Sequence, residues 1–168
     1  MQRYSVSAAL VAASLLCATS ASAEMIEGSA FYAGLWKGLG VRDAERNLVM
    51  CQVSLSGVQG ERIDFSLWSN NRFAILMAPV GVQFQGGQQY DVSIWTNVET
   101  AIAVPAVAMG ETILIVEFTD IDWAVDYLED SQILTVTGEG FQQSFSIASA
   151  NQALAGAKSC LEAYAAPG

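Results

Sequence analysis

The chain of 168 residues contains no histidine. This absence excludes a Ser-His-Asp triad, a Cys-His dyad and every metal site that depends on an imidazole. Only three cysteines are present, too few for a zinc site of four thiolates. The sequence therefore predicts no metal, no cofactor and no catalytic residue that can be assigned from a motif.

Basic residues are scarce. Seven Lys and Arg face 17 Asp and Glu, which gives a net charge of −10, and no Lys or Arg occurs between Phe73 and Ala157. Such a surface repels phosphate backbones and anionic lipid headgroups, so nucleic acid is not an expected partner. The plainest role of the acidic residues is to keep an exported protein in solution.

Long apolar runs are missing after the N-terminus. Residues 1–23 have the pattern of a signal peptide: Arg3, the apolar run Val6–Leu16, and a small-residue cleavage site at Ala21–Ala23. The run is shorter than the roughly 20 residues that span a bilayer, and Cys17 follows a leucine, which disfavours lipid attachment. We therefore predict a periplasmic or secreted protein without a membrane span.

Two cysteines, Cys51 and Cys160, remain once the leader is removed. In an oxidising compartment they have only each other as partners, so a disulfide is predicted between them. Closing a loop of about 100 residues stabilises a fold by up to roughly 4.7 kcal/mol in the chain-entropy model.

Most of the chain from residue 48 onward has the period of β-strands. Val49, Cys51, Val53 and Leu55 alternate with polar residues, which directs Cys51 into the core. In the next strand Ile63, Phe65 and Leu67 are expected inward, and Asp64, Ser66 and Trp68 outward. Further strands are predicted at 73–78, 82–84, 90–94, 101–109, 112–118, 133–136 and 141–147, with Pro105 indicating an edge strand or a bulge.

Two segments have helical spacing. Thr119 followed by Asp122 resembles a helix start, and residues 119–130 should form a short crossing helix. A C-terminal helix beginning at Ser149 or Asn151 carries Cys160 on its apolar face. The predicted fold is α+β and β-rich: an N-terminal arm or first strand at 24–47, then a domain at 48–168 built as an antiparallel sandwich or half-barrel of about eight strands.

Two tryptophans, Trp68 and Trp95, fall on the polar side of their strands. Outward tryptophans are typical of a surface that contacts a protein, peptide or sugar. The alternative is that a helix or the N-terminal arm covers that face and makes it a second core. Both interpretations stay open at this stage.

Carboxylates offer the one remaining route to catalysis. Asp120, Asp122, Asp126 and Asp130 lie close in sequence and could act as acid and base or bind a cation. Calcium needs six to eight oxygen ligands, and the glycine-containing loop of known sites is absent. Helix capping and solvation explain the same residues without a function.

The order of several segments resembles a set of small exported proteobacterial domains with one disulfide. The segments are ERIDFSL, AILMAPVGVQFQGGQQYDVSI, VDYLEDSQILTV and SFSIASANQALAGAKSC. The PVGV segment followed by a glycine turn is also similar to the invasion-associated locus B family. The resemblance implies a periplasmic or secreted β-rich domain used at the cell surface, and it supplies no catalytic residue.

The functional hypothesis from the sequence is an exported, non-enzymatic binding or accessory module that contacts a protein or peptide partner. Two alternatives stay open. One is a carboxylate-based hydrolase or cation-dependent enzyme that uses Asp120, Asp122 or Asp126. The other is a carrier that holds an apolar ligand inside the barrel.

Overall fold

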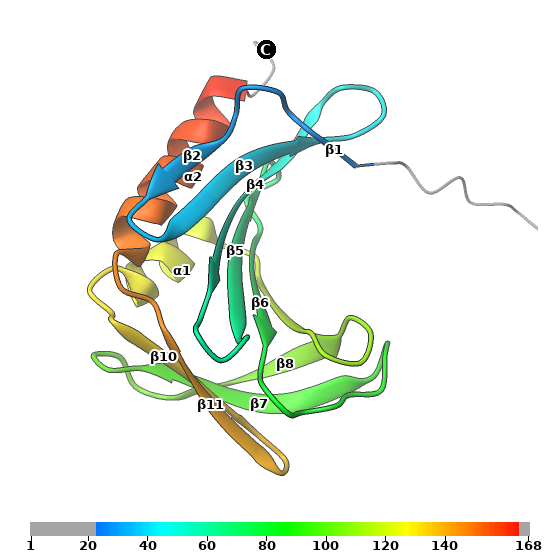
Figure 1. Ribbon diagram of the computed structural model, residues 1–168, viewed down its shortest axis with the longest axis vertical. Helices are drawn as coiled ribbons and strands as arrows, with labels where there is room; N and C mark the ends of the chain where they lie inside the picture. The colour runs from blue at the N-terminus through cyan, green and yellow to red at the C-terminus, as the bar shows by residue number, and fades with distance from the viewer. Residues whose placement is uncertain (1–22, 165–168) are drawn as a thin grey trace, which may run out of the picture.

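The computed structural model describes residues 23–164 (Figure 1), so the predicted leader lies outside the described residues except for its last position. The chain forms eleven strands and two helices in this range. The elements are β1 Glu24–Met25, β2 Phe31–Ala33, β3 Trp36–Arg42, β4 Leu48–Ser56, β5 Arg62–Trp68, β6 Phe73–Ala78, β7 Gln89–Thr96, β8 Ile102–Ala108, β9 Leu114–Phe118, α1 Ile121–Leu128, β10 Ile133–Gly138, β11 Phe141–Ser146 and α2 Ala150–Tyr164.

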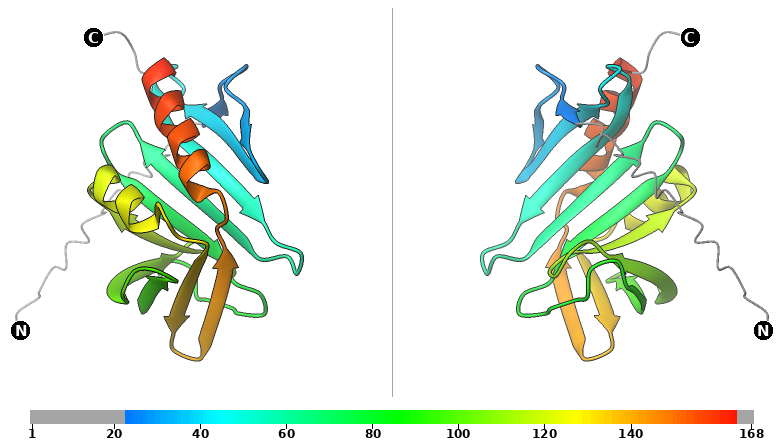
Figure 2. Two further views of the ribbon diagram at one scale, coloured as in Figure 1. Left: turned by 90° about the vertical axis from the view of Figure 1, so that its left-hand side faces the viewer. Right: turned by 90° about the vertical axis from the view of Figure 1, so that its right-hand side faces the viewer.

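All strands belong to one antiparallel sheet with the order β1-β3-β4-β5-β6-β9-β8-β7-β10-β11, and β2 pairs beside β3. The sheet curls so that β7, β8, β10 and β11 lie across one end of β4–β6 (Figures 1 and 2). The predicted β-rich antiparallel class, with a short helix and a C-terminal helix, is confirmed. The strand count is higher than expected because β1 and β2 have two and three residues, too few to show a period of two.

The core lies on the sheet face that holds Cys51, Phe65 and Phe73, and α2 packs there against β3, β4 and β5. The indole Nε1 of Trp36 donates a hydrogen bond to the Ala148 carbonyl oxygen (2.9 Å) and so joins the start of β3 to the segment after β11. The interior is filled by side chains. The largest of the fully buried ones are Trp36, Phe65, Phe73, Phe145, Ile63, Leu67, Ile75, Met77, Ile94, Leu114, Leu128 and Leu134.

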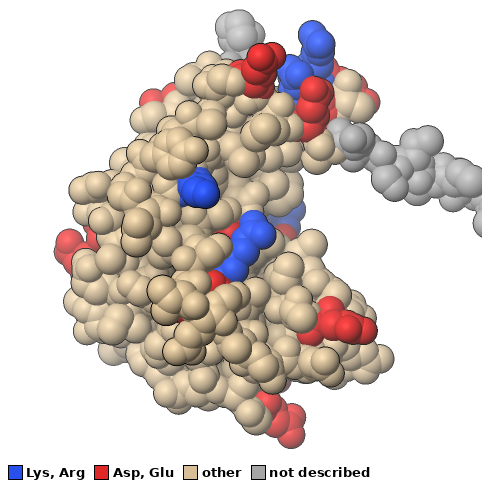
Figure 3. Space-filling model, in the orientation of Figure 1, with Lys and Arg blue, Asp and Glu red and all other residues tan. Residues whose placement is uncertain are grey.

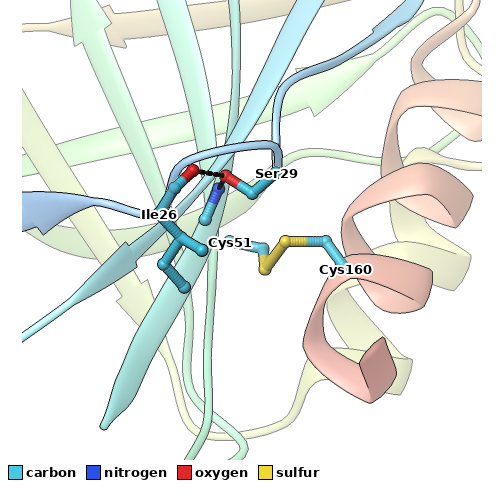
Figure 4. Close-up of a disulfide and its surroundings, with 5 residues drawn as sticks. Ile26, Ser29, Cys51 and Cys160 are labelled. Atoms are coloured by element: carbon cyan, nitrogen blue, oxygen red, sulfur yellow. Dashed lines mark hydrogen bonds between the residues drawn. A yellow bond between two sulfur atoms is a disulfide. The ribbon is translucent and has the colours of Figure 1, made fainter. Parts of the chain in front are cut away.

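The predicted disulfide is confirmed: Cys51 of β4 is bonded to Cys160 of α2, with a Cα–Cα distance of 6.1 Å across 109 positions of sequence (Figure 4). The N-terminal segment is fastened beside it. The Ser29 hydroxyl donates to the Ile26 carbonyl (2.6 Å) and accepts from the Gly40 N–H (2.9 Å). A Cβ at Gly40 would lie 3.3 Å from the Cys160 sulfur, so a larger residue here would make a tight contact with the disulfide.

Two local predictions need correction. The N-cap of α1 is Asp120 and not Thr119, because the Asp120 carboxylate accepts hydrogen bonds from the N–H groups of Asp122 and Trp123. The segment around Val82 and Phe84 is a loop and not a strand. Its apolar side chains still pack inward, and the Phe84 ring meets the Tyr90 ring edge-on at 5.4 Å.

The prediction that Pro105 marks an edge strand or a bulge holds only locally. As a whole β8 lies inside the sheet, with unbroken register to β7 and β9, but its side toward β9 is unpaired at Pro105. The pairing with β9 covers only Ala106 to Ala108 and stops next to the proline. Proline has no N–H to donate to a ladder, so β9 loses its partner beyond this point. Glu117 and Phe118 of β9 therefore have no paired residue on β8.

Candidate peptide-binding groove

A groove begins where β8 and β9 part, on the sheet face opposite the one that α2 covers. Its volume is about 620 Å³, within the range of ligand sites in proteins. The walls are strands from the middle of the sheet and the turns that follow them. The lining residues are Trp68, Arg72, Gln89, Pro105, Val107, Met109, Ile115, Glu117, Phe118 and Thr119.

The floor of the groove is apolar. Val107 and Ile115 are paired residues of β8 and β9, and they share this face with Leu76 of β6. Val107 is 41% exposed, and Met109, in the turn after β8, is 53% exposed. Large apolar side chains at this exposure in one concave surface are typical of an interaction site.

Trp68 forms one wall, at the end of β5. Its side chain is half-buried, and its indole Nε1 is buried with no hydrogen-bond partner among the described residues. The Arg72 guanidinium carbon lies 5.9 Å from the ring centroid, within the range of a cation–π contact. Arg72 also forms an ion pair with Glu117 of β9. This end of the groove therefore combines an aromatic surface with a neutralised ion pair.

An aromatic series joins β9 to α1 on the core face of the sheet, where Phe118 is the paired neighbour of Phe73. The Phe118 ring lies 5.3 Å from the Trp123 ring, and Trp123 in turn stacks on Tyr127 at 5.4 Å. Trp123 is exposed, whereas Tyr127 and Leu128 of the same helix are buried. Sequence reasoning missed Trp123 as a surface candidate, whereas Phe118 is half-buried against the core. In a helix of eight residues the spacing alone does not show which side is covered.

Trp95 does not line the groove. The strand registers place it on the same face of the sheet as Trp68, but β6, β9 and β8 lie between their strands. Four strand spacings correspond to about 19 Å along the sheet. Trp95 instead stands opposite Thr135 of β10 and is half-buried there. The structure thus places one of the two tryptophans in a candidate site and separates the other from it.

The charges close to the groove leave a small negative excess. Arg62 pairs with Asp64 (2.8 Å), and Arg72 pairs with Glu117. Asp91 lies opposite Pro105, is exposed, and forms no ion pair with any residue of the described range. Figure 3 shows that charged side chains are sparse on the side of the molecule it views and that the surface there is hollowed. A cationic group is the better electrostatic match to such a site.

Two of the four candidate acidic residues have structural partners, whereas Asp126 and Asp130 are exposed and form no ion pair in the described range. Asp120 caps α1, and the Asp122 carboxylate accepts a hydrogen bond from the Lys158 ammonium of α2 (2.8 Å). Within residues 23–164, no group of three or more Asp, Glu, Cys or His side chains is placed to hold a metal ion. The arrangement gives Asp120 and Asp122 a role in positioning α1 and α2.

Comparison with protein families, curated proteins and solved structures found no match to this chain. The resemblance to exported proteobacterial domains and to the invasion-associated locus B family stays a prediction. The part of the chain that the structure describes contains no helix with the length and apolarity to cross a bilayer. The disulfide is consistent with an oxidising compartment, and the signal peptide and the location outside the cytoplasm remain expectations.

Proposed function

We propose that this chain is an exported, non-enzymatic binding module that holds an extended segment of a partner protein in the groove beside Trp68. The observation that carries the proposal is the apolar floor of Val107, Met109 and Ile115 next to an aromatic wall. Tryptophan and arginine, as at Trp68 and Arg72, are the residue types that most often dominate binding energy at protein interfaces.

The chemistry of the groove indicates what the segment carries. An apolar side chain would cover the floor that water now contacts, and this burial would supply most of the affinity. A Lys or Arg beside it would face Asp91 and the nearby turn residue Glu111, neither of which has an ion-pair partner in the described chain. The proposed partner segment is therefore short, extended, and both apolar and basic.

A titration with a capped peptide of sequence Lys-Phe-Thr-Leu-Arg tests the proposal through the fluorescence of the tryptophans. We expect saturable binding that Val107→Lys weakens about tenfold or more, a loss of about 1.4 kcal/mol. Val98→Lys is the matched control, because Val98 is an exposed valine in the turn after β7, outside the groove lining. A peptide with Glu in place of Lys and Arg should bind more weakly to every variant. Equal affinity of the wild type and Val107→Lys would rule out the groove as the site.

The two alternative functions gain less support. The barrel interior is occupied by large side chains such as Trp36, Phe65 and Phe145, which leaves an apolar carrier little interior space. Asp120 and Asp122 already serve the helices, as described above. We therefore place the binding module first among the three.

A further inference from the structure

The sheet has two ends, and they differ in how well they are protected. At one end the outer strands are β1 and β2, of two and three residues, and β1 carries Glu24 in an ion pair with Arg42 of β3. At the other end lies β11, six residues long, with neither a charged residue nor a proline. Short strands, charges and prolines are the usual means by which proteins keep sheet edges from pairing, and β11 has none of them.

The backbone groups that β11 leaves free follow from its register with β10. The Ile147 N–H donates to the Gln132 carbonyl (2.8 Å), and bonded positions alternate in an antiparallel pair. Phe141, Gln143 and Phe145 therefore direct their backbone groups toward β10. The N–H and C=O groups of Gln142, Ser144 and Ser146 point away from the sheet.

Among residues 23–164, only one of these outward groups has a hydrogen-bond partner, and that partner is local. The Ser144 carbonyl accepts from the Nε2 of its own neighbour Gln143 (3.1 Å). A side-chain amide on an exposed strand can be displaced by a backbone N–H at little cost, because one hydrogen bond replaces another. Figure 2 shows β10 along one side of β11 and no strand paired along the other.

An apolar pit adjoins this free edge. It has a volume of about 230 Å³ and lies between the end of β11, the β4–β5 hairpin and the β2–β3 turn. Leu35 at its rim is 84% exposed, and Val58 is fully exposed. The residues that line it are Leu35, Leu55, Ser56, Gly57, Val58, Glu61, Ile63, Phe145 and Ser146. Two aliphatic side chains left in water beside an apolar hollow would gain from a side chain that fills it.

We propose that β11 is a docking edge at which an extended segment of another protein adds as a further antiparallel strand. The outward groups of Gln142, Ser144 and Ser146 bond its backbone. Residues directly opposite each other in paired strands point to the same face, so the residue opposite Phe145 is directed toward the pit. Main-chain bonds give affinity in this mode of recognition, and the pocket gives sequence preference.

A second copy of this chain does not fit the site. Antiparallel pairing of two β11 strands would place Phe141, Gln143 or Phe145 of the other copy opposite Phe145, because bonded positions must face each other. Phe141 is held by Phe84 at 5.6 Å between ring centroids, Phe145 is already buried in its own core, and Gln143 is polar. No register supplies a free apolar side chain for the pit.

The proposed occupant is a segment of a different protein, and the charges beside the edge indicate its composition. Glu61 at the pit and Glu139 at the hairpin tip form no ion pairs in the described range, which favours a Lys or Arg near each end of that segment.

The experiment uses the full mature chain and a capped synthetic peptide, Lys-Thr-Thr-Leu-Thr-Thr-Lys, with amide hydrogen exchange as the readout. In the free protein the N–H groups of Gln142, Ser144 and Ser146 should exchange fast and those of Gln143 and Phe145 slowly. Saturating peptide should slow the first three by about tenfold or more, because they become bonded. The same peptide with N-methyl groups on the two threonines next to the leucine should not bind, because those N–H groups face β11.

Variants separate this edge from the groove. Ser144→Pro removes one outward N–H and should abolish binding of the peptide, whereas Ser144→Ala, which loses the same hydroxyl bond to Thr135, should retain it. Leu35→Asp should weaken binding, and Val107→Lys should leave it unchanged. If Ser144→Pro fails to fold, the N-methylated peptide still decides the question. Absence of binding at about 1 mM peptide, equal binding of the N-methylated form, or self-association of the free protein through β11 would overturn the proposal.

Discussion

At the scale of the residue, Tyr127 shows how one polar group ties α1 to the sheet. Its hydroxyl lies 3.1 Å from the Ile94 carbonyl oxygen and 2.9 Å from that of Thr100, so its one proton can be donated to either. Burial raises the pKa of Tyr127 above its usual value, and the nearby carboxylate of Glu99 raises the pKa further. Both effects favour the neutral hydroxyl in the folded protein.

This raised pKa predicts a loss of stability in alkali. An unfolded tyrosine ionises near pH 10, and Tyr127 in the fold ionises at a higher pH. The free energy of unfolding should therefore hold the full contribution of Tyr127 below about pH 10 and lose it as the pH rises through the folded-state pKa. Tyr127→Phe should cost about 1 kcal/mol at neutral pH and make the decline above pH 10 shallower.

Urea unfolding at a series of pH values from about 8 to 11 measures both effects. Tyr32→Phe is the control, because Tyr32 is exposed and its hydroxyl makes no hydrogen bond within the described chain. An identical pH dependence in the wild type and Tyr127→Phe would contradict the argument.

At the scale of the element, one contact between α2 and the sheet is made through the ring of Phe31. Phe31 of β2 lies between Gly38 of β3 and Gly156 of α2. A Cβ at Gly38 would come 2.1 Å from the ring, and a Cβ at Gly156 would come 2.4 Å from it. Glycine in a helix weakens it by about 1 kcal/mol relative to alanine, and the structure supplies the reason for it here.

Gly156→Ala should therefore destabilise the protein even though alanine is the better helix former. The gain in helix propensity is about 1 kcal/mol, and overpacking against a ring held from both sides costs about 1–3 kcal/mol. In a Phe31→Leu background the smaller side chain should remove the clash and turn the same substitution stabilising. Urea unfolding of the two single variants and the double variant measures the coupling.

Ala155→Gly is the matched control. Ala155 is the exposed residue directly before Gly156 in α2, so its substitution reports helix propensity alone. A stabilising effect of Gly156→Ala in the wild-type background would show that Phe31 moves aside freely.

At the scale of the whole molecule, the sequence predicts what depends on local period and composition. The alternation in β4 and β5, the two helices and the pairing of Cys51 with Cys160 could all be read from residue types and spacing. The alternation of residues along each strand also showed which face of the sheet Trp68 and Trp95 share. It does not show how far apart the two tryptophans lie along the sheet. Their separation by three strands follows from the order β5-β6-β9-β8-β7, which no local pattern encodes. The groove was unpredictable for the same reason, because its lining combines Trp68 of β5 and Gln89 of β7 with residues of β8 and β9.

The disulfide links β4, an early strand of the sheet, to the C-terminal helix α2, so its removal should act on the whole fold. Cys51 and Cys160 join β4 to the helix that covers the core, and the loop they close spans 109 positions. Replacing both with alanine should lower the free energy of unfolding by about 2–5 kcal/mol, since the unfolded chain regains the entropy that the bond withholds. Urea unfolding measures the loss, and reductant should lower the stability of the wild type but not that of the double variant.

The position of the bond also predicts what survives its loss. The disulfide and α2 lie on one face of the sheet, whereas the groove beside Trp68 lies on the other and takes no residue from α2. Under conditions where the double alanine variant is still folded, the basic apolar peptide should bind it with the affinity of the wild type, because ladders between β5, β6, β9 and β8 hold the groove. If peptide affinity instead falls together with stability, the groove depends on the disulfide. The structures of the two faces of the sheet would then be coupled.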